Sequence, residues 1–288
     1  MASVEQYLTV LAGAQLPQNA EAQRAAAQMQ IELKAGDPRH AATVCTALAA
    51  RGKPIEARHF GYGVLHHVVQ KRWGEFNAEE RGQLATLVYS MLSEVGAAPE
   101  PEPWMIKSKV ATLMAEVVRQ EGAKLWARLM PDMAAGAASD SPVLAELSAL
   151  VLRFVAEDVA VYNADIVGGR MKELLFGLTS TLPQALPALY RILETHYSRA
   201  VNAVNAGNTA QAKQHAAAVS AALGAAAVYA EWAPLAPLMR SGLLDACGHF
   251  LASSEFRSQA CEVLRHVTYR RRGETVNSAI ASGAAAGA

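Results

Sequence analysis

The chain has 288 residues, of which 52% are apolar, which is enough for one large domain or two smaller ones. Lys and Arg together number 26, as do Asp and Glu, and the zero formal net charge provides no electrostatic basis for non-specific binding to nucleic acid or membranes. A net charge of zero is still compatible with a local basic patch. The three cysteines, Cys45, Cys247 and Cys261, form no C-x-x-C pair, which favours reduced thiols in an intracellular protein.

The first 13 residues lack the basic and apolar regions of a secretory signal. The longest apolar stretch, around 216–232, is mostly alanine and ends in Glu231 and Trp232. A bilayer span needs about 20 strongly apolar residues. We therefore expect no membrane insertion.

Apolar residues recur with the period of an α-helix along the chain, as in the stripe of Phe60, Val64 and Val68, and no sustained period-two pattern indicates strands. Gly, Pro, Asn and Ser interrupt this pattern at intervals. Between the breaks we predict twelve helices, at about 3–12, 18–35, 38–51, 55–73, 78–95, 102–121, 124–136, 142–162, 166–205, 209–232, 235–252 and 255–272. Pro183 and Pro187 should kink or split the ninth.

Three helix starts carry capping signals. Asp37 before Pro38 and Ser141 before Pro142 each combine an N-cap side chain with proline in the first turn. Asn77 is followed three residues later by Glu80, the pattern of a capping box.

The predicted helices form six pairs, and the first five pairs begin at intervals close to the length of a HEAT or armadillo repeat. Because an amphipathic helix pair cannot bury its own apolar face, stacked pairs share a continuous core. The pattern favours an all-α solenoid of about six HEAT-type pairs over residues 1–273; the alternative is a compact helical bundle. Residues 274–288 are rich in small residues and predict a disordered tail.

No motif supports catalysis or a cofactor. The G-Y-G run at 61–63 continues to His66 where a dinucleotide-binding motif needs glycine, and it lies within a helix. His66 and His67 point about 100° apart on a helix, which argues against a metal pair. Glu157 and Asp158 are more typical of a solvated helix end than of an acid–base pair. We expect neither an enzyme nor a cofactor or metal site.

One basic cluster stands out near the end of the last predicted helix. It comprises Arg265, His266, Arg270, Arg271 and Arg272. One interpretation is a contact to phosphate or to an acidic partner. The other is a solvated helix end, where cations are favoured by the helix dipole.

The segment Glu56–Trp73, E-A-R-H-F-G-Y-G-V-L-H-H-V-V-Q-K-R-W, resembles the second repeat of importin-beta-type transport receptors. Further stretches are similar to the exportin-5/Hasty family: K-L-W-A-R-L-M-P-D-M at 124–133, L-R-F-V-A-E-D-V at 152–159, Tyr229–Trp232 and Phe256–Gly273. They occur in the family's order over most of residues 1–273. The resemblance is to the N-terminal region of such a receptor, with an exportin-1-like region at about 102–273.

The resemblance implies a receptor that binds Ran-GTP through the inner helices of its first repeats and shuttles between nucleus and cytoplasm. Its branch carries hairpin RNA, such as pre-microRNA, and tRNA or protein cargo through the nuclear pore, with nucleoporins as further partners. The receptor itself does no chemistry. His66 departs from the family, which usually has an acid there. The alternative is a HEAT-repeat protein scaffold that does not depend on Ran.

The second helix of each pair is then expected to line the partner-binding face. The helical phase opposite the core stripe assigns six residues as candidates for contact with Ran: Tyr62, His66, Gln70, Lys109, Thr112 and Glu116. Ordinary solvated polar residues are the alternative at each position. Trp73, Trp126 and Phe154 lie in apolar stripes and are expected in the core.

Overall fold

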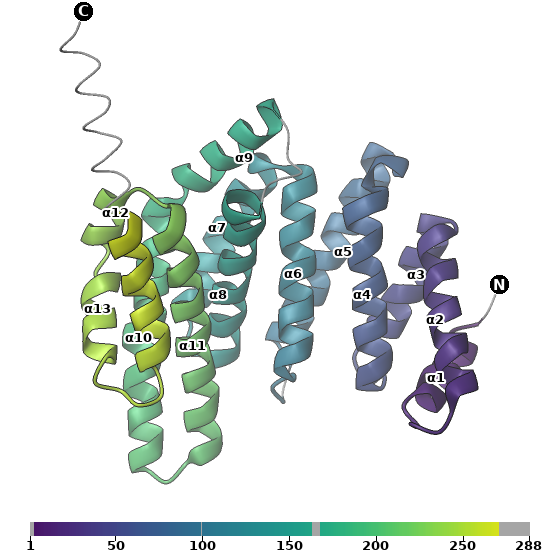
Figure 1. The fold of residues 1–288 in the computed structure, drawn as a ribbon, viewed down its shortest axis with the longest axis horizontal. Helices are drawn as coiled ribbons and strands as arrows, with labels where there is room; N and C mark the ends of the chain where they lie inside the picture. The colour runs from purple at the N-terminus through teal and green to yellow at the C-terminus, as the bar shows by residue number, and fades with distance from the viewer. Residues whose placement is uncertain (1–2, 99, 163–167, 271–288) are drawn as a thin grey trace, which may run out of the picture. The chain divides into compact units, whose positions relative to one another are not determined.

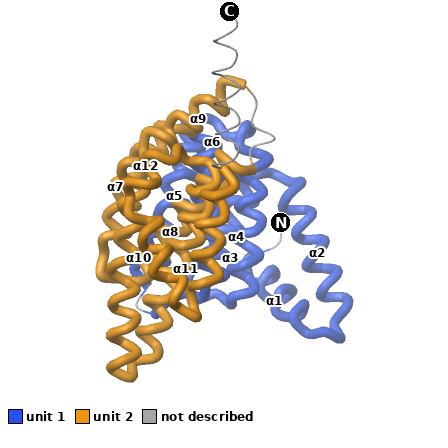
Figure 2. The backbone as a smooth tube through the Cα atoms, turned by 60° about the vertical axis from the view of Figure 1, so that its left-hand side comes forward, with its two compact units in different colours: residues 1–121 blue, residues 122–288 orange. Residues whose placement is uncertain are grey.

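The computed structural model describes residues 3–98, 100–162 and 168–270, and all regular structure in these ranges is helical. Helices follow one another in tandem pairs (Figure 1), which confirms the predicted all-α architecture of the HEAT and armadillo type. The chain divides into two compact units, Met1–Glu121 and Gly122–Ala288 (Figure 2). The predicted tail at 274–288 lies outside the described residues.

The first unit consists of three helix pairs. Their helices are α1 (Val4–Ala14), α2 (Ala20–Ala35), α3 (Pro38–Ala49), α4 (Ile55–Arg72), α5 (Ala78–Gly96) and α6 (Trp104–Glu121), with a 3-10 turn at Trp73–Glu75. The second helices form a row in which α4 packs against both α2 and α6. Since α4 also packs against α1 and α3, it is buried on several sides.

The second unit repeats the pairing and contains the two longest helices described, α10 and α11, with 24 residues each. They are α7 (Ala123–Ala137), α8 (Pro142–Ala156), α9 (Gly169–Ser180), α10 (Leu182–Asn205), α11 (Thr209–Trp232), α12 (Leu235–Arg240) and α13 (Leu243–Phe250), with a π-helical turn at Glu157–Val161 and a last helix over 257–270. Here α11 packs against α10 and α8, and the last helix lies beside α11, where Gln259 donates to the Ser220 carbonyl at 3.3 Å.

The predicted capping signals are all confirmed. Asp37 accepts hydrogen bonds from the backbone of Arg39 and His40, and Ser141 accepts one from the backbone of Leu144. Asn77 and Glu80 form a reciprocal capping box at the start of α5. Side chains at these positions satisfy amide groups that the helix itself leaves without acceptors.

Two long predicted helices are interrupted. The helix expected at 166–205 breaks at Thr181, which separates α9 from α10, in keeping with Pro183 in the first turn of α10. The prediction of a single helix at 235–252 is wrong, since α12 and α13 are separated by a turn at Ser241 and Gly242. Gly242 has a φ of 80°, which glycine adopts without steric cost.

Close packing explains one of the glycines in α4. A Cβ atom on Gly61 would lie 2.6 Å from the Cys45 carbonyl oxygen of α3, so the two helices require glycine there. Trp73 and Trp126 are buried, as predicted, whereas Phe154 is half-buried beneath the guanidinium of Arg153.

Candidate functional site

A groove on the row of second helices in the first unit has a volume of about 730 Å³. We call it the N-terminal groove. Helices α1, α2, α4 and α6 contribute its walls, including Leu11, Gln30, His59, Phe60, Met105 and Lys109. Phe60 is half-buried and Met105 exposed, so apolar surface on α4 and α6 remains open to a partner. A concave surface with apolar walls and a few polar groups suits a protein side chain or loop.

Lys109 and Glu56 are the two residues of opposite charge that line this groove. The Lys109 ammonium helps to lower the pKa of His59 and of His66, although burial is the larger cause for both imidazoles. The nearby Glu116 carboxylate acts on His66 in the opposite direction. His66 is therefore biased toward its neutral form, and Lys109 supplies the positive charge on this part of the surface.

Polar side chains continue from the groove along the contact between α4 and α6. Gln120 donates to a Glu116 carboxylate oxygen at 2.8 Å and approaches the Gln70 carbonyl at 3.5 Å. Arg119 reaches the same carboxylate of Glu116 at 3.5 Å. The carboxylate is thus held by two neighbours within the protein, and its orientation is set before any partner arrives.

The six candidate Ran contacts divide into two groups. His66, Gln70, Lys109 and Thr112 are half-buried, and they lie on α4 and α6, which pack together. Tyr62 and Glu116 are only 2% and 1% exposed, so the expectation that they face solvent is wrong. The cause is the position of α4 and α6 between several helices, which leaves a narrower free surface than a single apolar stripe suggests.

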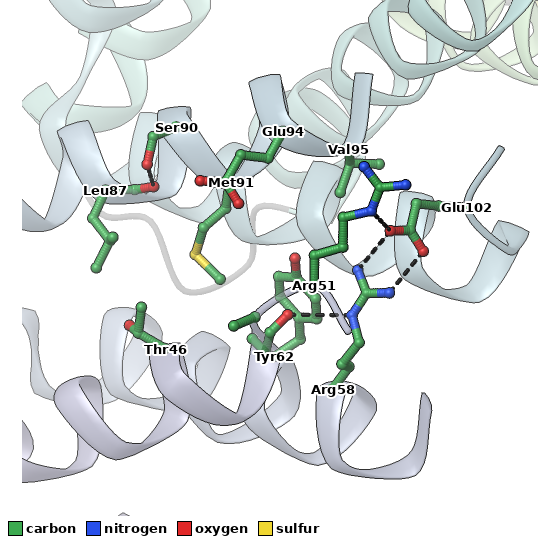
Figure 3. A pocket seen from close by; sticks show the side chains of 12 residues that line it. Thr46, Arg51, Arg58, Tyr62, Leu87, Ser90, Met91, Glu94, Val95 and Glu102 are labelled. Atoms are coloured by element: carbon green, nitrogen blue, oxygen red, sulfur yellow. Dashed lines mark hydrogen bonds and ion pairs between the residues drawn. The ribbon is translucent and has the colours of Figure 1, made fainter. Parts of the chain in front are cut away.

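Tyr62 lies on the other side of α4, against a small cavity of about 140 Å³ (Figure 3). Burial is the main cause of the raised pKa of its phenol. The buried face of α4 thus includes Tyr62, whereas Phe60, which was predicted in the core stripe, is only half-buried. Residues of α3 and α5 line this cavity together with Tyr62, whereas α4 also packs against α6.

A buried ion pair closes this small cavity. Arg58 donates to both carboxylate oxygens of Glu102, at 2.7 and 3.1 Å, and to the Ala49 carbonyl at 3.2 Å. Figure 3 shows Glu102 between the guanidinium groups of Arg58 and Arg51, the latter at 3.9 Å. Arg58 begins the Arg-His-Phe motif of the sequence, and its contacts show that it joins α3, α4 and the segment before α6.

The basic cluster of the last helix is largely engaged within the protein. Arg270 donates to the carbonyls of Ala230, Trp232 and Ala233 at the end of α11. His266 lies 3.9 Å from Glu262 and 4.0 Å from Glu231.

The guanidinium of Arg265 lies 3.9 Å from the Glu262 carboxylate and 5.9 Å from the centre of the Tyr269 ring. Arg271 and Arg272 lie outside the described residues. For Arg270, this geometry favours a structural role over a free phosphate contact.

Sequence reasoning did not find the N-terminal groove or the ion pair, since both join segments that are distant in the chain. The local sequence offers only one indication of the groove, which is that Met105 lies four residues before Lys109 on the same helix. Within 3–98, 100–162 and 168–270, no group of three metal-ligating side chains is present. No helix in the described part of the chain is long and apolar enough to cross a membrane.

The chain is similar to known proteins. Residues 103–264 match the family described as Exportin 1-like protein. The chain is 36% identical over 270 residues to Protein HASTY 1 of Arabidopsis thaliana. The aligned region covers 94% of the chain and 22% of that relative.

More distant matches are Exportin-5 of Dictyostelium discoideum and Exportin-6 of Danio rerio. The first is 22% identical over 49% of the chain, the second 25% over 47%, and each match covers 12% of the relative. The chain therefore spans about a fifth or less of the length of these relatives.

Proposed function

Because the chain belongs to the exportin 1-like family, we propose that it is a segment of a nuclear export receptor that binds Ran-GTP through α4 and α6. The proposal follows the family match and the similarity to HASTY 1 and exportin-5. It places the segment in a protein that shuttles between nucleus and cytoplasm and does no chemistry of its own.

The N-terminal groove with the adjoining polar side chains is the observation that supports this function best. Half-buried Lys109, Gln70, His66 and Thr112 lie on two helices that pack together. Phe60 and Met105 add accessible apolar surface beside Lys109. Apolar anchors surrounded by polar groups are typical of protein interfaces rather than of small-molecule sites.

A pull-down of the 288-residue chain with GTP-locked Ran tests the proposal, with GDP-loaded Ran as the nucleotide control. We expect retention only in the GTP form. Exchanging Lys109 for Glu together with Gln70 for Ala should reduce binding at least tenfold, because the substitutions reverse the charge at position 109 and remove a polar side chain at position 70.

The matched control is Lys172→Glu, a charge reversal at an exposed position in α9 of the second unit. It should bind Ran-GTP as the unchanged chain does. Equal binding by Lys109→Glu, Gln70→Ala and by this control would remove α4 and α6 from the interface. Binding that ignores the nucleotide would instead favour the second candidate, a HEAT-repeat scaffold without Ran dependence.

For cargo, the proposal covers hairpin RNA, tRNA and protein carried by the complete receptor, and nucleoporins during passage through the pore. The neutral net charge and the internal contacts of Arg270 support weak or absent RNA binding by this segment alone. A gel shift with a hairpin RNA, with and without Ran-GTP, measures this. Tight Ran-dependent binding would contradict the expectation and indicate that the segment holds a complete RNA site.

A further inference from the structure

A second cavity, of about 370 Å³, lies between α10 and α13 in the second unit. Three aromatic residues, Tyr190, Tyr197 and Phe250, line it. The Tyr197 and Phe250 rings meet edge to face with centroids 5.0 Å apart, and Phe256 packs against both. A Cβ atom on Gly242 would lie 3.0 Å from the Tyr190 ring, so the backbone of the α12–α13 turn supports that ring.

Two carboxylates stand at this cavity, and they come from different helices. Glu194 belongs to α10 and Asp245 to α13, and both residues are exposed. No ion pair with either carboxylate occurs among the described residues. Other acids of the same unit differ, since Asp140, Glu157 and Glu173 each pair with an arginine. The exposed His249 of α13 also lines the cavity. The cavity therefore presents two carboxylates that have no ion-pair partner in the described chain.

Aromatic faces and carboxylates together select a cation. The face of an aromatic ring is the negative end of its quadrupole, and a cation within about 6 Å of the centroid is attracted to it. A guanidinium is planar, stacks on aromatic rings and presents five N–H donors, enough to reach two carboxylates on separate helices. An ammonium has three donors and is more strongly hydrated. Phosphate groups and acidic segments would be repelled.

We propose that this cavity binds an arginine side chain of a protein partner, stacked on Tyr197 or Tyr190 and paired with Glu194 and Asp245. The inference does not depend on Ran binding, since none of these residues lies in the first unit. The carboxylates determine the charge of the occupant, and the rings determine its planar shape. An uncharged aromatic side chain would use the rings but leave the carboxylates without partners.

The test uses the 288-residue chain and three short peptides that differ at one central residue: arginine, citrulline or phenylalanine. Citrulline has nearly the shape of arginine without its charge. Peptide-detected NMR line broadening at low salt measures binding, because a single side chain binds weakly. We expect the arginine peptide to bind at least tenfold more tightly than the citrulline and phenylalanine peptides, and to lose this advantage as salt rises.

The variant Glu194→Gln, Asp245→Asn should reduce arginine-peptide binding at least tenfold. Its control, Glu79→Gln, Glu100→Gln, removes two exposed carboxylates from the first unit and should leave binding unchanged. All four positions are exposed, and far-UV circular dichroism verifies that both variants fold.

Equal binding of the citrulline peptide, preference for phenylalanine, or retained binding by the Gln/Asn variant would each overturn the proposal. So would failure of the unchanged chain to bind the arginine peptide. Loss of Ran binding in the earlier pull-down would leave this result unaffected.

Discussion

Each unit buries a polar pair, and the two pairs differ in chemical form. In the first unit, Arg58 and Glu102 form an ion pair whose side chains are both only 8% exposed. In the second unit, one buried pair is His196 and His215, on α10 and α11, with their Nδ1 atoms 2.8 Å apart. One pair is therefore charged, whereas the other consists of two imidazoles of which one must donate and the other accept.

This difference predicts different responses to pH and to substitution. A guanidinium keeps its proton at any ordinary pH, and removing its partner leaves a buried charge. A pair of imidazoles at hydrogen-bond distance loses its bond when both rings carry two N–H groups, because no acceptor remains. The first unit should thus be sensitive to loss of one side chain, and the second unit to acid.

The largest effect is expected for Arg58→Ala. It leaves the Glu102 carboxylate buried with only Arg51 at 3.9 Å, and it removes the donor to the Ala49 carbonyl. Breaking a buried pair from one side costs about 3–5 kcal/mol of unfolding free energy. Urea denaturation followed by circular dichroism measures this change.

Arg51→Ala is the matched control, since it removes an arginine near the same carboxylate but one that is 44% exposed and less close. Its cost should be under about 1 kcal/mol. Similar losses for the two substitutions would show that the ion pair does not stabilise the first unit, and would remove one side of the comparison.

The next largest effect concerns acid. Burial, the neighbouring His215 and Arg199 lower the pKa of His196 to about 4, and burial is also the main cause of the lowered pKa of His215. Because the folded state binds fewer protons than the unfolded chain, stability is retained above about pH 6.5 and falls as the pH drops toward 4. For His196 alone, the loss between pH 7.5 and pH 5 is about 2 kcal/mol.

Urea denaturation at pH 7.5 and pH 5 measures this loss, and a His196→Leu, His215→Leu variant should lose less stability between the two values. NMR titration of the histidine ring protons provides a check that does not require the variant to fold. A His196 signal that titrates near pH 6.5 would contradict the neutral pair and make the two units alike in their polar cores.

The helices and their ends could be predicted from the sequence because their causes are local. Apolar residues at helical spacing and side chains such as Asp37, Ser141 and Asn77 act within one or two turns. The break at Gly242 was missed although Ser241-Gly242 is a dipeptide typical of turns, because the apolar residues on its two sides were interpreted as one helix. The pairing of successive helices could be predicted from the lengths of the segments between the breaks.

The candidate surface was harder to predict because burial depends on neighbours far along the chain. Tyr62 and Glu116 occupy the polar phase of their helices, yet α4 and α6 have packing partners on more than one side. Arg58 is separated from Glu102 by 44 residues, so nothing in the local pattern indicates their pairing. Lys109 and Gln70 are half-buried rather than enclosed, and their contact with Ran stays a prediction.

The smallest effect tests a feature that the two units share. In each, an arginine at the end of a second helix donates to carbonyls at the end of the preceding second helix. Arg72 reaches the carbonyls of Lys34 and Gly36 at 2.8 and 3.1 Å, whereas Arg270 bonds to three carbonyls after Tyr229 at 2.7–3.1 Å. Cations are favoured there, since the last carbonyls of a helix lack internal donors.

Arg270→Ala should cost about 1–2 kcal/mol of unfolding free energy. Arg72→Ala should lower the urea midpoint by less, because Arg72 donates to only two carbonyls and its other partner, Glu75, is exposed, so that ion pair adds little. Lysine at either position should restore only part of the loss, since an ammonium cannot present the fork of a guanidinium. Arg191→Ala, at an exposed position of α10, is the control and should leave the midpoint unchanged. If Arg191→Ala costs as much as Arg270→Ala, the contacts at the helix ends do not join successive pairs, and packing of the second helices alone must hold them together.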